Sequence, residues 1–273
     1  MSVDDAAVTG AARRSRWEQL RQVASRTSDL DLGTLAAGPA FWLLLSVFPA
    51  GLVAVNVLGL FVTQEEVAAQ IGELANETPG TWGELLAQQL LVVAAPSPGT
   101  GPYDVALVLL ALWTVSNALV SLLRALRRTY GLGRTRAILG RSLAAGVGIT
   151  IIAVVAILAE AVDAPTLFGT VVGTVATGGL LFVMVLGLMR VALGRAQSWR
   201  SLLPGAAWAA TGLLAVGAAL NLYAAVSINL TLVYGRIAGL VVSMLTVWLS
   251  VYVVLLGAVI NSVLRDSERR AGP

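Results

Sequence analysis

The chain has 273 residues, of which 57% are hydrophobic and only 12% are charged, with 18 basic and 15 acidic side chains. A soluble domain of this length needs a more charged surface, so the composition indicates a membrane protein. Cysteine, histidine and lysine are absent, which excludes disulfides, thiol or imidazole metal sites, thiol nucleophiles and lysine Schiff bases.

A polar, arginine-rich segment, residues 1–31, opens the chain. Trp17, Leu20, Val23 and Ala24 recur in it at helical spacing. We therefore expect an amphipathic helix on the cytoplasmic side, held at the membrane surface by attraction between its arginines and anionic lipid headgroups.

Long apolar stretches make up most of the remaining sequence. A helix needs about 20 apolar residues to cross a hydrocarbon layer of about 30 Å. We predict an all-α, polytopic membrane domain over residues 32–264, followed by a cytoplasmic tail over residues 265–273. Its six transmembrane helices are predicted near residues 34–62, 103–124, 142–162, 166–190, 202–228 and 237–264.

The arginines occupy alternate loops. Every arginine except Arg236 lies in the N-terminal segment, in the loops after the second and fourth spans, or in the tail. Cytoplasmic loops carry the excess of arginine in membrane proteins, so both termini are predicted to be cytoplasmic. The loop of residues 63–102 contains glutamates but no arginine and is predicted to be external. Capping-box patterns at Thr63 and Thr81 predict two short helices there, either a lid on the bundle or a pair on the outer membrane surface.

Polar residues inside the spans are candidates for a site. Pro49 removes a backbone donor, so the first span should be kinked or broken near Ser46, and broken helices often line transport sites. Amides on four different helices would lose free energy if they faced lipid: Asn56, Asn117, Asn221 and Asn261. They act either as hydrogen-bonding contacts between helices or, with Ser46 and Pro49, as a polar pathway.

Two further features concern packing. Trp113 and Trp248 lie near the middle of their spans, where their indole N–H groups need partners. Small residues give the fifth span faces that allow close backbone approach: Gly205, Ala209, Gly212 and Ala215. These faces make contacts inside the bundle or join copies of the chain in a homo-oligomer.

Arg236 is predicted to lie externally, at the N-terminus of the sixth span, where the helix dipole disfavours a cation. We predict a salt bridge from Arg236 to Glu160 or Asp163, at the external end of the third span. The alternatives are an arginine that reaches outer-leaflet phosphates and an anchor for an anionic substrate headgroup. Arg124 ends the second span, where a helix C-terminus and anionic lipid headgroups both favour a cation.

Nucleic-acid chemistry is not expected. A metal-dependent nuclease needs carboxylates or histidines around a metal on the cytoplasmic side, and the loops after the second and fourth spans contain neither. The acids of the terminal segments lack ligand-like spacing, and the arginines fit membrane orientation better than RNA binding. We predict membrane lipids as partners, no nucleic acid, no enzyme activity, no metal and no cofactor.

Much of the sequence resembles the YihY/BrkB family of bacterial inner-membrane proteins. The matching runs are LAAGPAFWLLLSVFPAGLVAVNVLGLF (35–61), WTVSNALVSLLRALRRTYGL (113–132) and residues 202–261. The pieces that carry the resemblance are Ser46 with Pro49, Trp113 with Arg124, Pro204-Gly205, Tyr234-Gly235, and Gly257 with Asn261. It implies six transmembrane helices in the plasma (inner) membrane. The family has no settled biochemical activity, and its ribonuclease BN and virulence-factor labels are inherited names.

Two positions depart from the family pattern. Val259 stands where the family has an acidic residue, which argues against a mechanism that needs a carboxylate there, and Arg236 stands where a small or apolar residue is expected. Two functions stay open. One is a transporter or flippase that moves an amphiphilic envelope component, a lipid or lipid-linked molecule. The other is a non-transporting scaffold in envelope maintenance. A groove or cavity lined by the polar-pathway residues favours transport, and a dry interior favours a scaffold.

Overall fold

The computed structural model describes residues 17–58, 102–133, 167–194, 197–226 and 238–270, and every regular element in these ranges is helical. An N-terminal helix, Trp17–Asp29, comes first. It is followed by α2 (Leu32–Leu58), α5 (Pro102–Thr129), α7 (Leu167–Leu193), α8 (Trp199–Val226) and α10 (Ala238–Arg270). The predicted all-α class is confirmed for this part of the chain.

Several of these helices suit a membrane. By length and apolar character, three described segments could cross one: Val108–Thr129, Trp199–Leu220 and Leu240–Ser267. The N-terminal helix and the first part of α2 form a fourth if that bent pair is counted as one span. The apolar part of α7 is shorter, Thr177–Leu193. The predicted third span and the predicted external loop lie outside the described residues.

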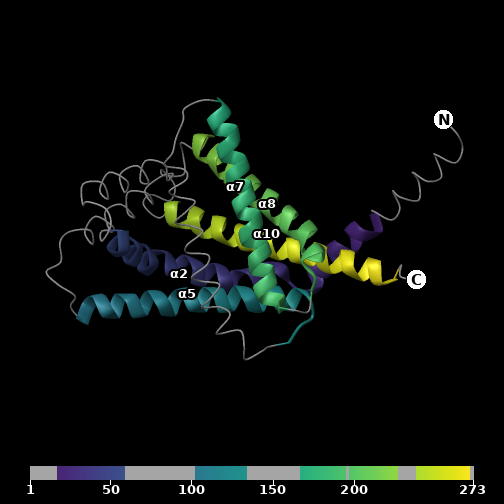
Figure 1. Cartoon of the computed structure of the whole chain (residues 1–273), viewed down its shortest axis with the longest axis horizontal. Coiled ribbons are helices and arrows are strands. Elements are labelled where there is room, and N and C mark those ends of the chain that lie inside the picture. The colour runs from purple at the N-terminus through teal and green to yellow at the C-terminus, as the bar shows by residue number, and fades with distance from the viewer. Residues whose placement is uncertain (1–16, 59–101, 134–166, 195–196, 227–237, 271–273) are drawn as a thin grey trace, which may run out of the picture.

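The helices pack as two pairs joined through α10. α2 lies along α5 and α8 lies along α10, while α10 also contacts α2 and α5. α7 packs on α8 and reaches α5. In Figure 1 the yellow α10 runs between the purple α2 and the green α8.

The buried core lies toward one end of this bundle. It is built from the start of α2, the second halves of α5, α7 and α10, and the first part of α8, with Leu126, Val185, Leu202 and Leu255 all fully buried. Large apolar side chains on the remaining lengths are exposed, as expected of surfaces that face lipid: Leu109, Leu112, Val175, Leu222, Met244 and Leu245.

Arginine side chains gather at the packed end, which we call the arginine end. The N-terminal helix and the C-terminal part of α10 meet there through Arg26 and Asp266. Arg127 of α5 contacts the last turn of α7, Arg190 of α7 contacts the α7–α8 connection, and Arg265 lies against Tyr130. The N-terminal helix and the end of α10 therefore lie at the same end of the molecule (Figure 1).

Glycines with left-handed backbone follow the last residues of two helices, α5 and α7. Gly131 (φ 67°) follows α5, and the amides of Gly131 and Leu132 donate to the carbonyl oxygens of Arg128 and Arg127. This pattern is a Schellman motif, in which glycine avoids the steric cost of the turn. Gly194 (φ 62°) follows α7 in the same backbone conformation.

The sharpest bend lies at Asp31. Its φ of 45° is left-handed, a conformation that aspartate tolerates better than most non-glycine residues. Its amide donates to the Ser28 carbonyl at 3.0 Å, and its own carbonyl accepts from Leu35 at 2.9 Å. Asp31 thus ends the N-terminal helix and begins α2, and the two helices differ in direction by 61°.

α2 is not broken at Pro49. It stays helical through both Pro39 and Pro49, so the first span is not broken near Ser46, and a kink there stays a prediction. A proline removes one backbone donor, and in a membrane bundle neighbouring groups compensate for that loss. The Ser46 hydroxyl donates to the carbonyl of Leu43 at 2.7 Å, within the same helix.

Candidate functional site

A buried polar contact joins α10 to α8 through Asn261. This side chain is 2% exposed. Its Oδ1 accepts a hydrogen bond from the amide of Gly205 at 2.7 Å, and its Nδ2 donates to the carbonyl of Leu202 at 3.0 Å. Pro204 lies between these two backbone groups and has no N–H to donate. One carboxamide therefore satisfies a donor and an acceptor next to a proline inside α8.

Glycines make this contact geometrically permissible. A Cβ on Gly205 would overlap the carbonyl oxygen of Gly257. A Cβ on Gly257 would lie 2.5 Å from the carbonyl oxygen of Gly205 and 2.9 Å from the Cβ of Ala209. Further along, a Cβ on Gly212 would overlap the side chain of Val253. The small face of the fifth predicted span thus makes contacts inside the bundle at these positions, whereas Ala215 is exposed.

The other candidates for the polar pathway do not join Asn261. Ser46 is bonded within α2, and the Nδ2 of Asn117 donates to the carbonyl of Trp113 at 2.8 Å, one turn back in α5. Asn56 and Asn221 lie on α2 and α8, and their side chains are outside the described part of the structure. Of the described candidates, Asn261 makes contact between helices, and the other two satisfy their own backbone.

The two tryptophans find different surroundings. The indole N–H of Trp248 donates to the carbonyl of Gly33 at 3.0 Å, which ties α10 to the first turn of α2. Trp113 is 56% exposed and lies edge-on to Trp42, with ring centroids 5.3 Å apart. The first is an internal contact, and the second is part of the exposed apolar surface.

At the arginine end, arginines hold helix termini together, a role that the sequence analysis did not assign to them. Arg26 donates to the hydroxyl of Ser262 at 2.9 Å and forms an ion pair with Asp266. These contacts secure the N-terminal helix to α10. Side-chain pairs between residues so far apart leave no pattern in the sequence that could have revealed them.

Two arginines act on the C-terminus of α7. Arg127 donates to the carbonyl of Ala192 at 2.9 Å, and Arg190 donates to the carbonyl of Gln197 at 2.7 Å while its guanidinium lies 5.0 Å from the ring of Trp199. Cations near carbonyls at a helix C-terminus are favoured by the helix dipole. Arg124 is exposed, and Arg236, Glu160 and Asp163 lie outside the described residues, so the predicted salt bridge stays a prediction.

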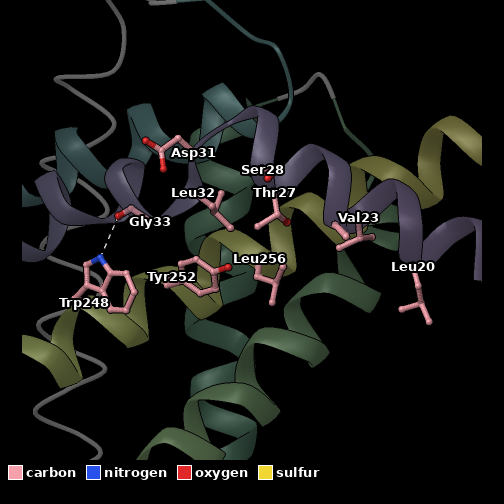
Figure 2. A pocket seen from close by; sticks show the side chains of 11 residues that line it. Leu20, Val23, Thr27, Ser28, Asp31, Leu32, Gly33, Trp248, Tyr252 and Leu256 are labelled. Carbon is pink, nitrogen blue, oxygen red and sulfur yellow. Dashed lines mark hydrogen bonds between the residues drawn. The ribbon is translucent and has the colours of Figure 1, made fainter.

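A groove opens between the N-terminal helix and α10, and we call it the N-helix groove. Its volume is about 660 Å³. The residues that line it are Leu20, Val23, Ala24, Thr27, Ser28, Asp31, Leu32, Gly33, Trp248, Tyr252 and Leu256. In Figure 2, Leu20 and Val23 lie at one end, and Asp31, Gly33 and Trp248 lie at the other. The groove is therefore apolar at one end and aromatic and acidic at the other.

A smaller opening of about 310 Å³ lies beside the contact between Arg26 and Asp266. Arg128, Tyr130 and Arg265 also line it. The guanidinium of Arg265 lies 5.6 Å from the centroid of the Tyr130 ring. Burial raises the pKa of Tyr130 to about 12, so this phenol stays neutral at physiological pH. Among the described residues, no group of three or more acidic residues could hold a metal ion.

Comparison with known proteins gives a family and one distant relative. The sequence model of the family described as Virulence factor BrkB matches residues 23–273. The chain is 24% identical over 270 residues to the ribonuclease-like protein YfkH of Bacillus subtilis (strain 168), covering 92% of this chain and 96% of the relative. No solved structure matches the chain.

Proposed function

This chain belongs to the Virulence factor BrkB family, and from the shape of its N-helix groove we propose that it binds an amphiphilic component of the envelope, a lipid or lipid-linked molecule, and moves it across the membrane. In this proposal the chain spans the bacterial plasma (inner) membrane six times. Both termini are cytoplasmic, so the arginine end faces the cytoplasm.

The observation that carries the proposal is the two-ended lining of the groove. An amphiphile needs an apolar surface for its chains and polar groups for its headgroup, and the groove offers both along one length. The groove lies where the N-terminal helix joins α2, and it runs along α10 from Trp248 toward the arginine end.

The alternative is a non-transporting scaffold in envelope maintenance. The close contact of Gly205 with Gly257, which Asn261 holds with a hydrogen bond, favours it, because this joint is closely packed. Ser46 and Asn117 also bond within their own helices rather than lining a track. Nuclease activity, which the name of the Bacillus relative mentions, is not part of either proposal.

Translocation of fluorescent lipid in vesicles that contain the purified full-length protein tests the proposal. We expect lipid to cross faster than in protein-free vesicles. Ala24→Trp should slow the crossing because it fills the groove. The matched control is Ala207→Trp, which adds the same bulk on an exposed position of α8. Crossing at the protein-free rate, in vesicles where the protein is shown to be inserted, would support the scaffold instead.

A further inference from the structure

The smaller opening at the arginine end receives one arginine from each of three chain segments. Arg26 comes from the N-terminal helix, Arg128 from α5 and Arg265 from α10. No residue lines both this opening and the N-helix groove. We propose that the opening binds a phosphate group, carried by an anionic lipid of the inner leaflet or by a soluble phosphate ester, and that the bound phosphate joins the three segments.

The charges around the opening are unequal. Beside the three guanidinium groups, two carboxylates line it, those of Asp29 and Asp266. Asp266 is shared, because it pairs with Arg26 while its Oδ1 lies 3.4 Å from the Nε of Arg265. Asp29 is exposed and accepts a hydrogen bond from the hydroxyl of Ser25 at 3.3 Å. The lining therefore carries an excess of positive charge, which attracts an anion.

Arg128 supplies a cation that can turn to a ligand. Its side chain is exposed, and within the described ranges no carboxylate forms a salt bridge with it. A guanidinium presents its N–H donors as a planar fork that can hold two phosphate oxygens at once. Arg265 offers a second fork, and its guanidinium lies 5.6 Å from the centroid of the Tyr130 ring, which restricts its orientation.

The end of α5 also borders the opening. Carbonyl oxygens at a helix C-terminus carry partial negative charge and disfavour an anion. Here the amide of Gly131 donates to the carbonyl of Arg128 at 3.0 Å, and the amide of Leu132 donates to the carbonyl of Arg127 at 3.0 Å. These carbonyls are already satisfied, so the full charges of the guanidinium groups outweigh their effect.

The size and place of the opening suit a headgroup. Its volume is about 310 Å³, near the lower end of the range of about 300–1,000 Å³ for small-molecule sites. This volume accommodates a phosphate ester and leaves acyl chains outside. In the orientation proposed above, the arginine end faces the cytoplasm, so the phosphates of inner-leaflet lipids lie at its level.

The test measures the binding of three probes to the full-length protein in detergent by native mass spectrometry. The probes are dihexanoyl-phosphatidylglycerol, glycerol phosphate, and dihexanoylglycerol, which has the acyl chains without the phosphate. We expect phosphatidylglycerol to bind about tenfold more tightly than dihexanoylglycerol, because only the phosphate makes charge-assisted hydrogen bonds. Glycerol phosphate that binds as tightly as the lipid identifies a soluble ligand, and weaker binding identifies the lipid. If neither phosphate probe binds more tightly than dihexanoylglycerol, the inference is overturned.

Matched variants separate this site from general attraction to a basic surface. Arg128→Gln should weaken binding of the phosphate probes about fivefold, the most that one exposed ion pair contributes, and leave dihexanoylglycerol unaffected. Arg200→Gln is the control, since Arg200 is exposed in the first turn of α8 and does not line the opening. Unchanged affinity in Arg128→Gln, or an equal loss in Arg200→Gln, would overturn the inference.

Hydrogen exchange tests whether the phosphate joins the segments. With phosphatidylglycerol or glycerol phosphate bound, exchange over residues 17–29 should slow, because Arg26 of that helix would share the ligand with α5 and α10. The slowing should be smaller in Arg128→Gln at the same probe concentration. Binding without any slowing would overturn the joining of the N-terminal helix. Neither measurement involves membrane crossing, so failure of lipid transport would leave this site standing.

Discussion

The Oδ1 atom of Asn261 accepts the backbone N–H of Gly205 at 2.7 Å, across the interface between α10 and α8. The same carboxamide donates to the carbonyl of Leu202. The Asn261 side chain is buried, so water cannot reach the two backbone groups beside Pro204. The carboxamide supplies their hydrogen bonds instead. The two hydrogen bonds fix the position of α10 against α8 at this point.

Asn261→Leu should lower the thermal stability of the protein in detergent. The change removes the hydrogen bonds from Asn261 to the Gly205 N–H and the Leu202 carbonyl, and each such bond contributes about 0.5–1.5 kcal/mol. Asn117→Leu is the control, since Asn117 is less buried and bonds within its own helix. The unfolding temperature of each variant is measured by intrinsic tryptophan emission. A loss for Asn117→Leu as large as that for Asn261→Leu would contradict the assignment.

Gly205→Ala should destabilise the protein more than its added methyl group suggests. The new Cβ overlaps the carbonyl oxygen of Gly257, so α8 and α10 must move apart and lose packing along their contact. Gly217→Ala, on the same helix, has nothing within 4 Å of the new Cβ. That control should be neutral or stabilising by up to about 1 kcal/mol, because alanine favours helix more than glycine does. Similar unfolding temperatures for the two variants would show that the helices are less closely packed here.

Arg26→Gln should loosen the N-terminal helix without unfolding the bundle. The variant loses the ion pair with Asp266. In this pair the Arg26 side chain is 37% exposed and the Asp266 side chain is 28% exposed. A contact this open to solvent contributes at most about 1 kcal/mol. Hydrogen exchange over residues 17–29 should become faster, while α5 and α8 keep their protection. Arg21→Gln, an exposed position on the same helix, should leave exchange unchanged, and an equal acceleration there would argue for a general charge effect.

Arg124→Glu should reduce the amount of inserted protein more than Arg134→Glu. Arg124 lies in the last turns of α5, where the helix C-terminus and the anionic membrane surface both disfavour a carboxylate. Arg134 follows the last residue of α5, Thr129, and lies outside the described residues and beyond the predicted second span. The amount of each variant extracted from the membrane measures its insertion. Equal amounts for the two variants would contradict a particular requirement for Arg124.

The amino-acid sequence alone was enough to assign this protein to the membrane proteins and to its family. Three properties can be read from neighbouring residues without knowing what each residue touches: the long apolar stretches, the clusters of arginines between them, and the runs shared with the BrkB family. Helices lie over five of the predicted stretches for this reason. The small face of the fifth stretch, with Gly205 and Gly212, could be predicted because close approach of helices requires small side chains.

The tertiary structure decided what each polar residue does. Asn117 and Asn261 look alike in sequence, yet the first bonds within its own helix and the second joins two helices, because their partners depend on how far the helices are rotated and shifted against each other. Pro49 does not break α2, and the bend between the N-terminal helix and α2 lies at Asp31, whose left-handed backbone no sequence pattern marked. The groove and the bond from Trp248 to Gly33 arise where chain segments distant in sequence meet, so only their three-dimensional packing could bring them together.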